Sequence, residues 1–305
     1  MTRFVLTLVA ILIAVPAISV AAELDDSFAA LQAAEAKKDV ALVKKLAVET
    51  SALAREEAEI EQPADPSLKQ TWKERTAWAR DVEKRCEYAL YALSLQTEPE
   101  VAIDLLTTLE SLNPKSQYLD EGGYAQYFAM LQKTGAAAKI PAVAENALKN
   151  LPNSADVLIV LLDNAMAKSQ LSTALTYGQR LVNAMSKASK PEGVSDADWN
   201  TKRSVALGHG YYAIGMANAA SNRFFEVDKA LRAALPYIKG NPGMYGPALF
   251  HLGIANFQLG VQTNNKKRVL EAASFSEQAS KVAFPQAQDA YRNTQAMRAQ
   301  AAKMQ

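Results

Sequence analysis

The sequence is poor in the residue types that cross-link or interrupt a chain. Its 305 residues include a single cysteine, Cys86, so the chain can form no internal disulfide. Glycine (13) and proline (12) are scarce, which excludes collagen-like and low-complexity architectures. The 33 basic and 32 acidic side chains leave a net charge of +1, so no general attraction to nucleic acid is expected. We therefore expect a folded protein whose partner is not a nucleic acid.

Signatures of catalysis are also missing from the sequence. The two histidines, His209 and His251, form neither a His-x3-His nor a His-Glu-x2-His zinc motif. There is no Gly-x-Ser-x-Gly or Gly-x4-Gly-Lys motif, and Gly208-His209-Gly210 follows no predicted strand. Cys86 lies in an apolar run and is predicted to be a buried, inert thiol. We predict no enzymatic activity, no cofactor and no metal site.

The first residues are typical of an export signal. Arg3 gives a basic start, an apolar run of about a dozen residues follows, and Val20 and Ala22 supply small side chains for a signal peptidase. An uncleaved membrane anchor is the alternative, but the run is shorter than the ~20 residues that a spanning helix needs. We predict cleavage after Ala22, followed by export to a periplasm or out of the cell, with no membrane span in the remaining protein.

The rest of the chain has the periodicity of helices. From Leu24 onward apolar residues recur at spacings of three and four, without sustained alternation, which predicts an all-α fold. Residues 83–114 and 121–152 each read as a helix, a short polar break and a second helix. Residues 155–185 repeat this plan with a break near Ser169. The pattern predicts an array of helical hairpins.

The clearest repeat lies in the C-terminal part. Tyr211 stands as a large opening residue, the pair Ile214-Gly215 follows, and Leu231 occupies a packing position in the next helix. The segment that begins at Leu249 repeats this order and contains Gly253. We expect Gly215 and Gly253 to let one helix approach its partner closely. The pattern resembles that of tetratricopeptide repeats, whose unit of about 34 residues is a pair of helices.

The resemblance implies a particular architecture and function. Tetratricopeptide repeats stack into a solenoid, whose concave surface is lined by the first helix of each unit and holds a segment of a partner protein. The predicted division is a signal peptide at 1–22, a divergent helical pair and linker at 23–80, and repeats at 81–190. Further repeats and a capping helix would occupy 191–305. The basic run 264–268 is predicted to be an insertion between the helices of the last repeat.

In this register certain side chains of the first helices face the groove. The set is mixed in character, and its apolar and aromatic C-terminal part predicts a hydrophobic ligand segment anchored by Tyr212, Phe250 and Phe257. The predicted contact residues are Tyr91, Asp163, Met166, His209, Tyr212, Met216, Phe250, Ile254 and Phe257.

Two other functions remain open at this point. A helical domain could bind a small molecule or act as an enzyme in a pocket near His209 and His251, which would then have to converge. Alternatively, the apolar C-terminal half could serve homo-oligomerisation. The sequence favours an exported scaffold that binds a protein or peptide and performs no reaction.

Overall fold

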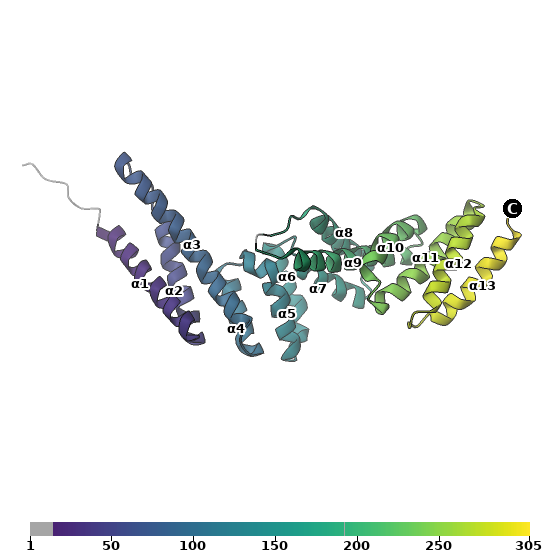
Figure 1. Ribbon diagram of the computed structural model, residues 1–305, viewed down its shortest axis with the longest axis horizontal. Coiled ribbons are helices and arrows are strands. Elements are labelled where there is room, and N and C mark those ends of the chain that lie inside the picture. Colours follow the sequence, from purple (N-terminus) through teal and green to yellow (C-terminus); the bar gives the residue numbers. More distant parts are fainter. Residues whose placement is uncertain (1–14, 192) are drawn as a thin grey trace, which may run out of the picture. The chain divides into compact units, whose positions relative to one another are not determined.

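The computed structural model describes residues 15–191 and 193–305 and shows a protein built from helices (Figure 1). The described residues form thirteen α-helices, α1 to α13, and no strand. The predicted all-α class is therefore confirmed. The predicted signal peptide falls largely outside the described residues, and helix α1 runs across the predicted cut at Ala22.

The chain divides into two compact units, and the division falls between Gly135 and Ala136 in the sequence. This division lies inside the predicted repeat block 81–190. The first unit contains five α-helices, a short 3-10 helix and a π-helical turn. They are α1 (Val15–Lys37), α2 (Val40–Ala58), η1 (Pro66–Leu68), α3 (Lys69–Ser94), α4 (Pro99–Leu112), η2 (Leu119–Gly123) and α5 (Tyr124–Lys133).

The second unit contains the remaining eight α-helices and holds the candidate site. A 3-10 turn, η3 (Ala137–Lys139), leads into them. The α-helices are α6 (Ile140–Asn150), α7 (Ala155–Ala167), α8 (Leu171–Lys187), α9 (Asp196–Ala220), α10 (Phe224–Ile238), α11 (Pro242–Gln262), α12 (Lys266–Ser280) and α13 (Ala287–Lys303).

Helices that follow one another in the chain pack side by side within each unit. In the second unit there is an additional row of contacts between alternate helices: α7 touches α9, α9 touches α11, and α11 touches α13. Such a double set of contacts is expected when helical hairpins are stacked, because each hairpin must bury its apolar face against the next one. Within each unit, the packing of consecutive helices is consistent with the repeat plan that the sequence predicts. The predicted hairpin at 121–152 is divided, because α5 belongs to the first unit and α6 to the second.

Four of the turns inside helical pairs share one backbone conformation. The residues Lys38, Ser169, Asn222 and Asn264 all have φ between 49° and 55°. At the last of them, the Asn264 N–H donates to the Val261 carbonyl (3.2 Å), and the following N–H donates to the Gly260 carbonyl (2.7 Å). The same two bonds close the other three turns. This is the Schellman ending, in which a left-handed residue terminates the helix. It places the predicted break near Ser169 at that residue.

A glycine at one of these turns is expected to stabilise the protein. A left-handed residue with a side chain costs about 1–2 kcal/mol, which glycine avoids at some cost in chain entropy. We expect Ser169→Gly to raise the free energy of unfolding by about 0.5–1 kcal/mol. Asn222→Gly should change it less, because asparagine tolerates this conformation. Urea unfolding followed by circular dichroism measures both, and a Ser169→Gly variant less stable than wild type would contradict the assignment.

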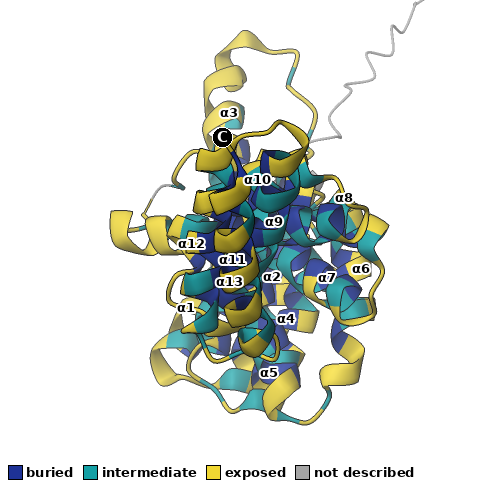
Figure 2. Cartoon of the chain, turned by 90° about the vertical axis from the view of Figure 1, so that its right-hand side faces the viewer, coloured by how far each residue is buried: buried dark blue, intermediate teal, exposed yellow. Residues whose placement is uncertain are grey.

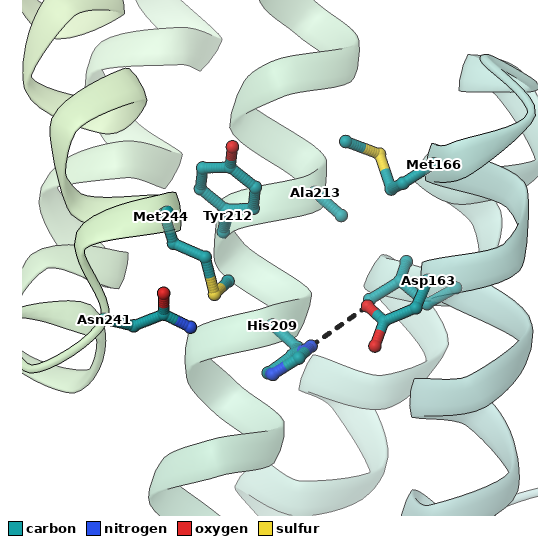
Figure 3. A pocket seen from close by; sticks show the side chains of 9 residues that line it. Asp163, Met166, His209, Tyr212, Ala213, Asn241 and Met244 are labelled. Carbon is teal, nitrogen blue, oxygen red and sulfur yellow. Dashed lines mark hydrogen bonds and ion pairs between the residues drawn. The ribbon is translucent and has the colours of Figure 1, made fainter. Parts of the chain in front are cut away.

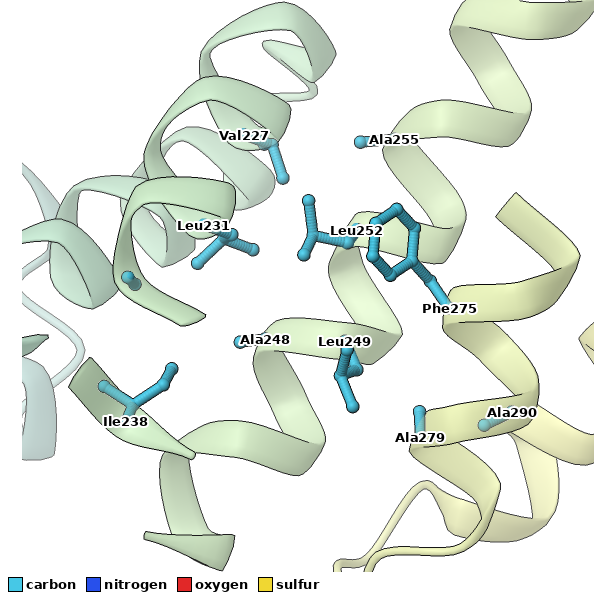
Figure 4. Close-up of a cluster of buried hydrophobic side chains, with 11 residues drawn as sticks. Val227, Leu231, Ile238, Ala248, Leu249, Leu252, Ala255, Phe275, Ala279 and Ala290 are labelled. Atoms are coloured by element: carbon cyan, nitrogen blue, oxygen red, sulfur yellow. The ribbon is translucent and has the colours of Figure 1, made fainter. Parts of the chain in front are cut away.

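The core of the second unit consists of clusters that each join several successive helices. Its C-terminal cluster takes Leu231 from α10, Leu249 and Leu252 from α11, Phe275 from α12 and Ala290 from α13 (Figure 4). A second cluster joins α7, α8 and α9 in the same way. Buried residues lie on the helix faces turned toward neighbouring helices, and exposed residues lie on the outward faces (Figure 2). No single hairpin could bury these faces alone.

Two glycines set how closely the helices approach. A Cβ atom on Gly215 of α9 would lie 2.3 Å from Leu231 Cδ2 of α10. On Gly253 of α11 it would lie 2.3 Å from Ser276 Oγ of α12. These distances are far inside van der Waals contact, so the helix pairs have the close approach that the sequence predicts at both positions.

Candidate functional site

A cavity of about 300 Å³ opens between three alternate helices of the second unit (Figure 3). Helices α7 and α9 form two of its walls, and the turn that begins α11 forms the third. Its lining residues are Leu162, Asp163, Met166, His209, Tyr212, Ala213, Asn241, Gly243 and Met244.

Helix α7 positions its two contributions by its periodicity. Leu158, Leu162 and Ala165 are buried and hold one face of the helix in the core. Asp163 and Met166, which are adjacent on the helix surface, therefore lie at the edge of that face. Asp163 is exposed and Met166 is half-buried, and both side chains extend toward the cavity (Figure 3).

The Gly208-His209-Gly210 sequence on α9 has a packing role. A Cβ on Gly208 would lie 3.1 Å from Tyr237 Cβ of α10, and one on Gly210 would lie 2.7 Å from Val182 Cγ2 of α8. The two glycines thus let α9 fit between its neighbouring helices. His209, between them in sequence, is left on the face that lines the cavity. Tyr212 follows three positions later on the same face.

Two polar bridges join α7 to α9. His209 Nδ1 lies 3.1 Å from Asp163 Oδ1 at the cavity. About two helical turns earlier on both helices, Lys202 Nζ lies 2.9 Å from Asp156 Oδ2. Lys202 carries a permanent positive charge at neutral pH, whereas His209 is positive only when protonated. The Lys202–Asp156 bridge is therefore a full ion pair, whereas the His209–Asp163 bridge leaves a negative charge at the cavity when His209 is neutral.

Several polar groups around the cavity are available to a ligand. Within the part of the chain that the structure describes, Asp163 Oδ2 and the Tyr212 hydroxyl have no hydrogen-bond partner. Asn241 precedes the first residue of α11, and its side chain makes no capping bond to that helix. Burial raises the pKa of Tyr212, so its hydroxyl stays protonated at neutral pH. The cavity can thus offer hydrogen bonds from α7, from α9 and from the turn before α11.

The structure places the nine predicted contact residues at least partly at the surface, since none of them is fully buried. Four of them, Asp163, Met166, His209 and Tyr212, meet at the cavity. Met216 and Ile254 are half-buried on α9 and α11 and do not line it.

The other aromatic residues among the predicted contacts, Tyr91 and the predicted anchors Phe250 and Phe257, pack against neighbours of their own. Tyr91 belongs to the first unit, where its ring stacks on Tyr118 at 5.9 Å. Phe250 packs against the C-terminal core cluster and meets the Phe284 ring edge-on at 6.1 Å. Phe257 packs against the cluster formed by α12 and α13. Of the three predicted anchors, only Tyr212 lines the cavity.

Sequence reasoning missed the third wall of the cavity. Asn241, Gly243 and Met244 come from the turn into α11, whereas the repeat register assigns contacts only to the middle of a helix. A signal was present in the sequence, because Asn241-Pro242 is a typical helix start and implies a turn beside the next hairpin. The buried lining residues Leu162 and Ala213 could be predicted from the sequence only as core positions.

The two histidines do not share this cavity. His251 lies on α11, half-buried, and its ring meets Phe250 edge-on at 5.5 Å. It is not among the residues that line the cavity around His209. Burial lowers the pKa of His251, because desolvation disfavours the charged ring.

The lowered pKa of His251 predicts a pH-dependent stability. The unfolded chain protonates this histidine near pH 6.5, whereas the folded protein does so only at lower pH. Stability is thus fully present above pH 6.5 and falls as the pH drops toward the folded pKa. We expect His251→Gln to reduce the stability lost between pH 7.5 and pH 5. Urea unfolding of both proteins at the two pH values measures this, and equal losses would contradict it.

The structure contradicts the prediction for the basic run 264–268. It was predicted to be an inserted loop, but Asn264 and Asn265 make a tight turn and the helix α12 begins at Lys266. The Asn265 side chain accepts the Arg268 N–H at 3.0 Å, which caps the helix. The asparagines were read as loop residues, although the same residue type favours left-handed turns and helix caps.

Arg268 belongs to a polar network around a second cavity of about 420 Å³. Its Nη2 donates to Asp228 Oδ2 at 3.1 Å and its Nε to the fully buried Asn256 Oδ1 at 2.9 Å. Arg232 bonds to the same two residues and to Glu271. Bonds to Glu271 and Asp228 raise the pKa of Arg232. The network ties α10, α11 and α12 together and satisfies its own charges.

Other candidate centres of chemistry are unpromising. Among the residues that the structure describes, no group of histidine, cysteine and acidic side chains could hold a metal ion. Cys86 is buried in α3 as predicted, and burial raises the pKa of its thiol to about 12. A thiol in that state is a poor nucleophile. No described helix has both the length and the apolar content needed to cross a membrane.

Comparisons of this chain with protein-family models, with curated proteins and with solved structures gave no match.

Proposed function

We propose that this protein is an exported scaffold of stacked helical hairpins, similar to tetratricopeptide repeats, that binds a segment of a partner protein and performs no reaction. The observation that carries the proposal is the cavity between α7, α9 and α11, at which Asp163, Met166, His209 and Tyr212 meet. In such a solenoid the first helix of each pair lines the concave surface. Helices α7, α9 and α11 are the first helices of their pairs in this register.

The lining of the cavity supports binding of a side chain. Met166 and Met244 have flexible, polarisable side chains that adapt to ligands of different shape. Tyr212 adds a large ring with a hydroxyl, a residue type enriched at the energetic centres of protein interfaces. The volume of about 300 Å³ accommodates one or two side chains of a bound segment.

Export is the second part of the proposal and rests on residues 1–22. Leu24, two positions after the predicted cut, is fully buried, so cleavage after Ala22 would leave this core position of α1 in place. N-terminal sequencing of the protein recovered from expressing cells tests the cut. We expect the mature sequence to begin at Glu23, and a protein that retains its first residues would contradict export by cleavage.

The binding proposal predicts a hot spot at Tyr212. We expect selection from a displayed library of random peptides to yield ligands for the wild-type protein. Tyr212→Ala should weaken their binding by about tenfold, because it removes the large ring from the cavity wall. Fluorescence polarisation with a labelled peptide measures the affinity.

Tyr291 on α13 provides the matched control. This residue is 54% exposed and lies outside the cavity, so Tyr291→Ala makes the same truncation elsewhere. We expect this variant to bind as the wild type does. Failure to select any peptide, or equal losses in both variants, would contradict a binding site at the cavity.

A small-molecule site is the second candidate, favoured by the size of the cavity. About 300 Å³ is at the lower end of the range for small-molecule pockets. A thermal-shift screen of small metabolites separates the two functions. A compound that stabilises the wild type but not the Tyr212→Ala variant would favour this candidate, and the lack of any such compound would count against it.

A further inference from the structure

We propose that the cavity between α7, α9 and α11 is a pocket for one basic side chain, lysine or arginine, of the bound segment. This inference rests on the proposed function and names the chemistry of the residue that enters the pocket. It follows from the charge of the lining, from the hydrogen-bond acceptors around it and from its apolar walls.

The lining carries a net negative charge whenever His209 is neutral. Among the described residues that line the cavity, Asp163 carries the only permanent charge at neutral pH. Its side chain is 55% exposed, so it remains accessible. His209 contacts Oδ1 of this carboxylate, which leaves Oδ2 free to accept a hydrogen bond. A cation is thus the charged group that complements this site.

The neighbouring Lys202–Asp156 bridge shows how a cation within the chain can neutralise an aspartate of α7. Asp156, on the same helix, is paired with the ammonium group of Lys202 on α9. His209 takes the equivalent place beside Asp163. A neutral imidazole that donates from Nδ1 orients the carboxylate without cancelling its charge. The carboxylate of Asp163 can therefore pair with a cation from outside the chain when His209 is neutral.

The other lining groups fit a cation carried on a hydrocarbon stem. The Tyr212 hydroxyl and the Asn241 side-chain oxygen can accept hydrogen bonds in addition to Asp163. An ammonium group has three N–H donors, and a guanidinium group has five. Met166, Met244 and Ala213 supply apolar surface along which the stem of such a side chain packs. The Tyr212 ring adds attraction for a cation near its face.

Two substitutions test the charge of the pocket. Asp163→Asn keeps the shape and removes the charge, and we expect it to weaken a selected peptide about tenfold. His209→Lys supplies the cation from within the chain, as Lys202 does for Asp156, and should weaken the peptide by a similar factor. Asp104→Asn is the matched control, because Asp104 is an equally exposed aspartate (57%) in the other unit, paired with Lys44. It should bind as the wild type does.

The peptides provide the second readout. Selection on the wild type should enrich lysine or arginine at one position, and replacing that residue with norleucine should weaken binding as strongly as Asp163→Asn does. The norleucine peptide should bind the Asp163→Asn variant only slightly more weakly than either change alone predicts for its own pair. Circular dichroism confirms that each variant is folded.

The outcomes separate this inference from the proposed function. Peptides that depend on Tyr212 but show no basic residue, or that bind the Asp163→Asn variant unchanged, would overturn the basic-side-chain pocket and leave the binding scaffold standing. Enrichment of acidic residues would also overturn it. Peptides that do not depend on Tyr212 would contradict the proposed site itself.

Discussion

Replacing Gly215 with valine is expected to lower the free energy of unfolding by about 3 kcal/mol. The new Cβ would lie 2.3 Å from Leu231 Cδ2 and 2.4 Å from its Cγ. Leu231 is fully buried in the core that joins α10 to α11, so it has no open space to move into. Valine also gains less helix propensity over glycine than alanine would, so propensity offsets only part of the cost.

Alanine variants isolate the steric origin of this effect. Gly240→Ala is the control, because a Cβ there meets no atom within 4 Å, and we expect no loss of stability. Gly215→Ala and Leu231→Ala should each destabilise, the first by overpacking and the second by leaving a cavity. Their combination should cost less than the sum of the two, since each relieves the defect of the other. Additive losses in urea unfolding would contradict the close contact.

Replacing Asn256 with leucine is expected to destabilise the protein by about 2 kcal/mol. Asn256 is fully buried, and its side-chain oxygen accepts from Arg232 Nη2 (3.2 Å) and Arg268 Nε (2.9 Å). Its Nδ2 donates to Asp228 Oδ1 at 2.6 Å. Leucine has a similar size but can make none of these bonds. The two guanidinium groups and the carboxylate would each lose a partner in a partly buried site.

The control for this substitution is Asn183→Leu on α8. Asn183 is exposed and lies on a helix, so the same change there should leave stability nearly unchanged. Urea unfolding at neutral pH compares the two variants. If Asn256→Leu is as stable as the wild type, the network contributes nothing to holding α10, α11 and α12 together.

Helix boundaries were largely predictable because local chemistry determines them. The predicted pair at 155–185 corresponds to α7 with α8, and the break predicted near Ser169 falls on the left-handed residue. The predicted pair at 83–114 covers α4 and only the last part of α3, which begins at Lys69. The apolar spacing of three and four residues appears as buried helix faces. These features depend on residues that are close together in the chain. Apolar periodicity and turn residues are signals of the same local kind, so they predict such features well.

The site was less predictable because it joins segments distant in sequence. The spacing of residues on α9 selects His209 and Tyr212, but nothing in the sequence says that Asp163 faces His209. Likewise, Asn256 is an ordinary polar residue on a helix until Asp228 and Arg268 are brought beside it. The prediction for the basic run 264–268 was wrong for a different reason, since the asparagines that form its turn and helix cap also occur in loops.

Photo-crosslinking of a selected peptide tests most directly whether the cavity holds a partner segment. A benzophenone amino acid would replace Met166 at the cavity, and the same amino acid would replace Tyr291 on α13 as the reference. Binding in the cavity predicts a crosslink from position 166 that free peptide competes away, and little from position 291. Equal crosslinking at both positions, or crosslinking only at 291, would contradict the proposed binding site.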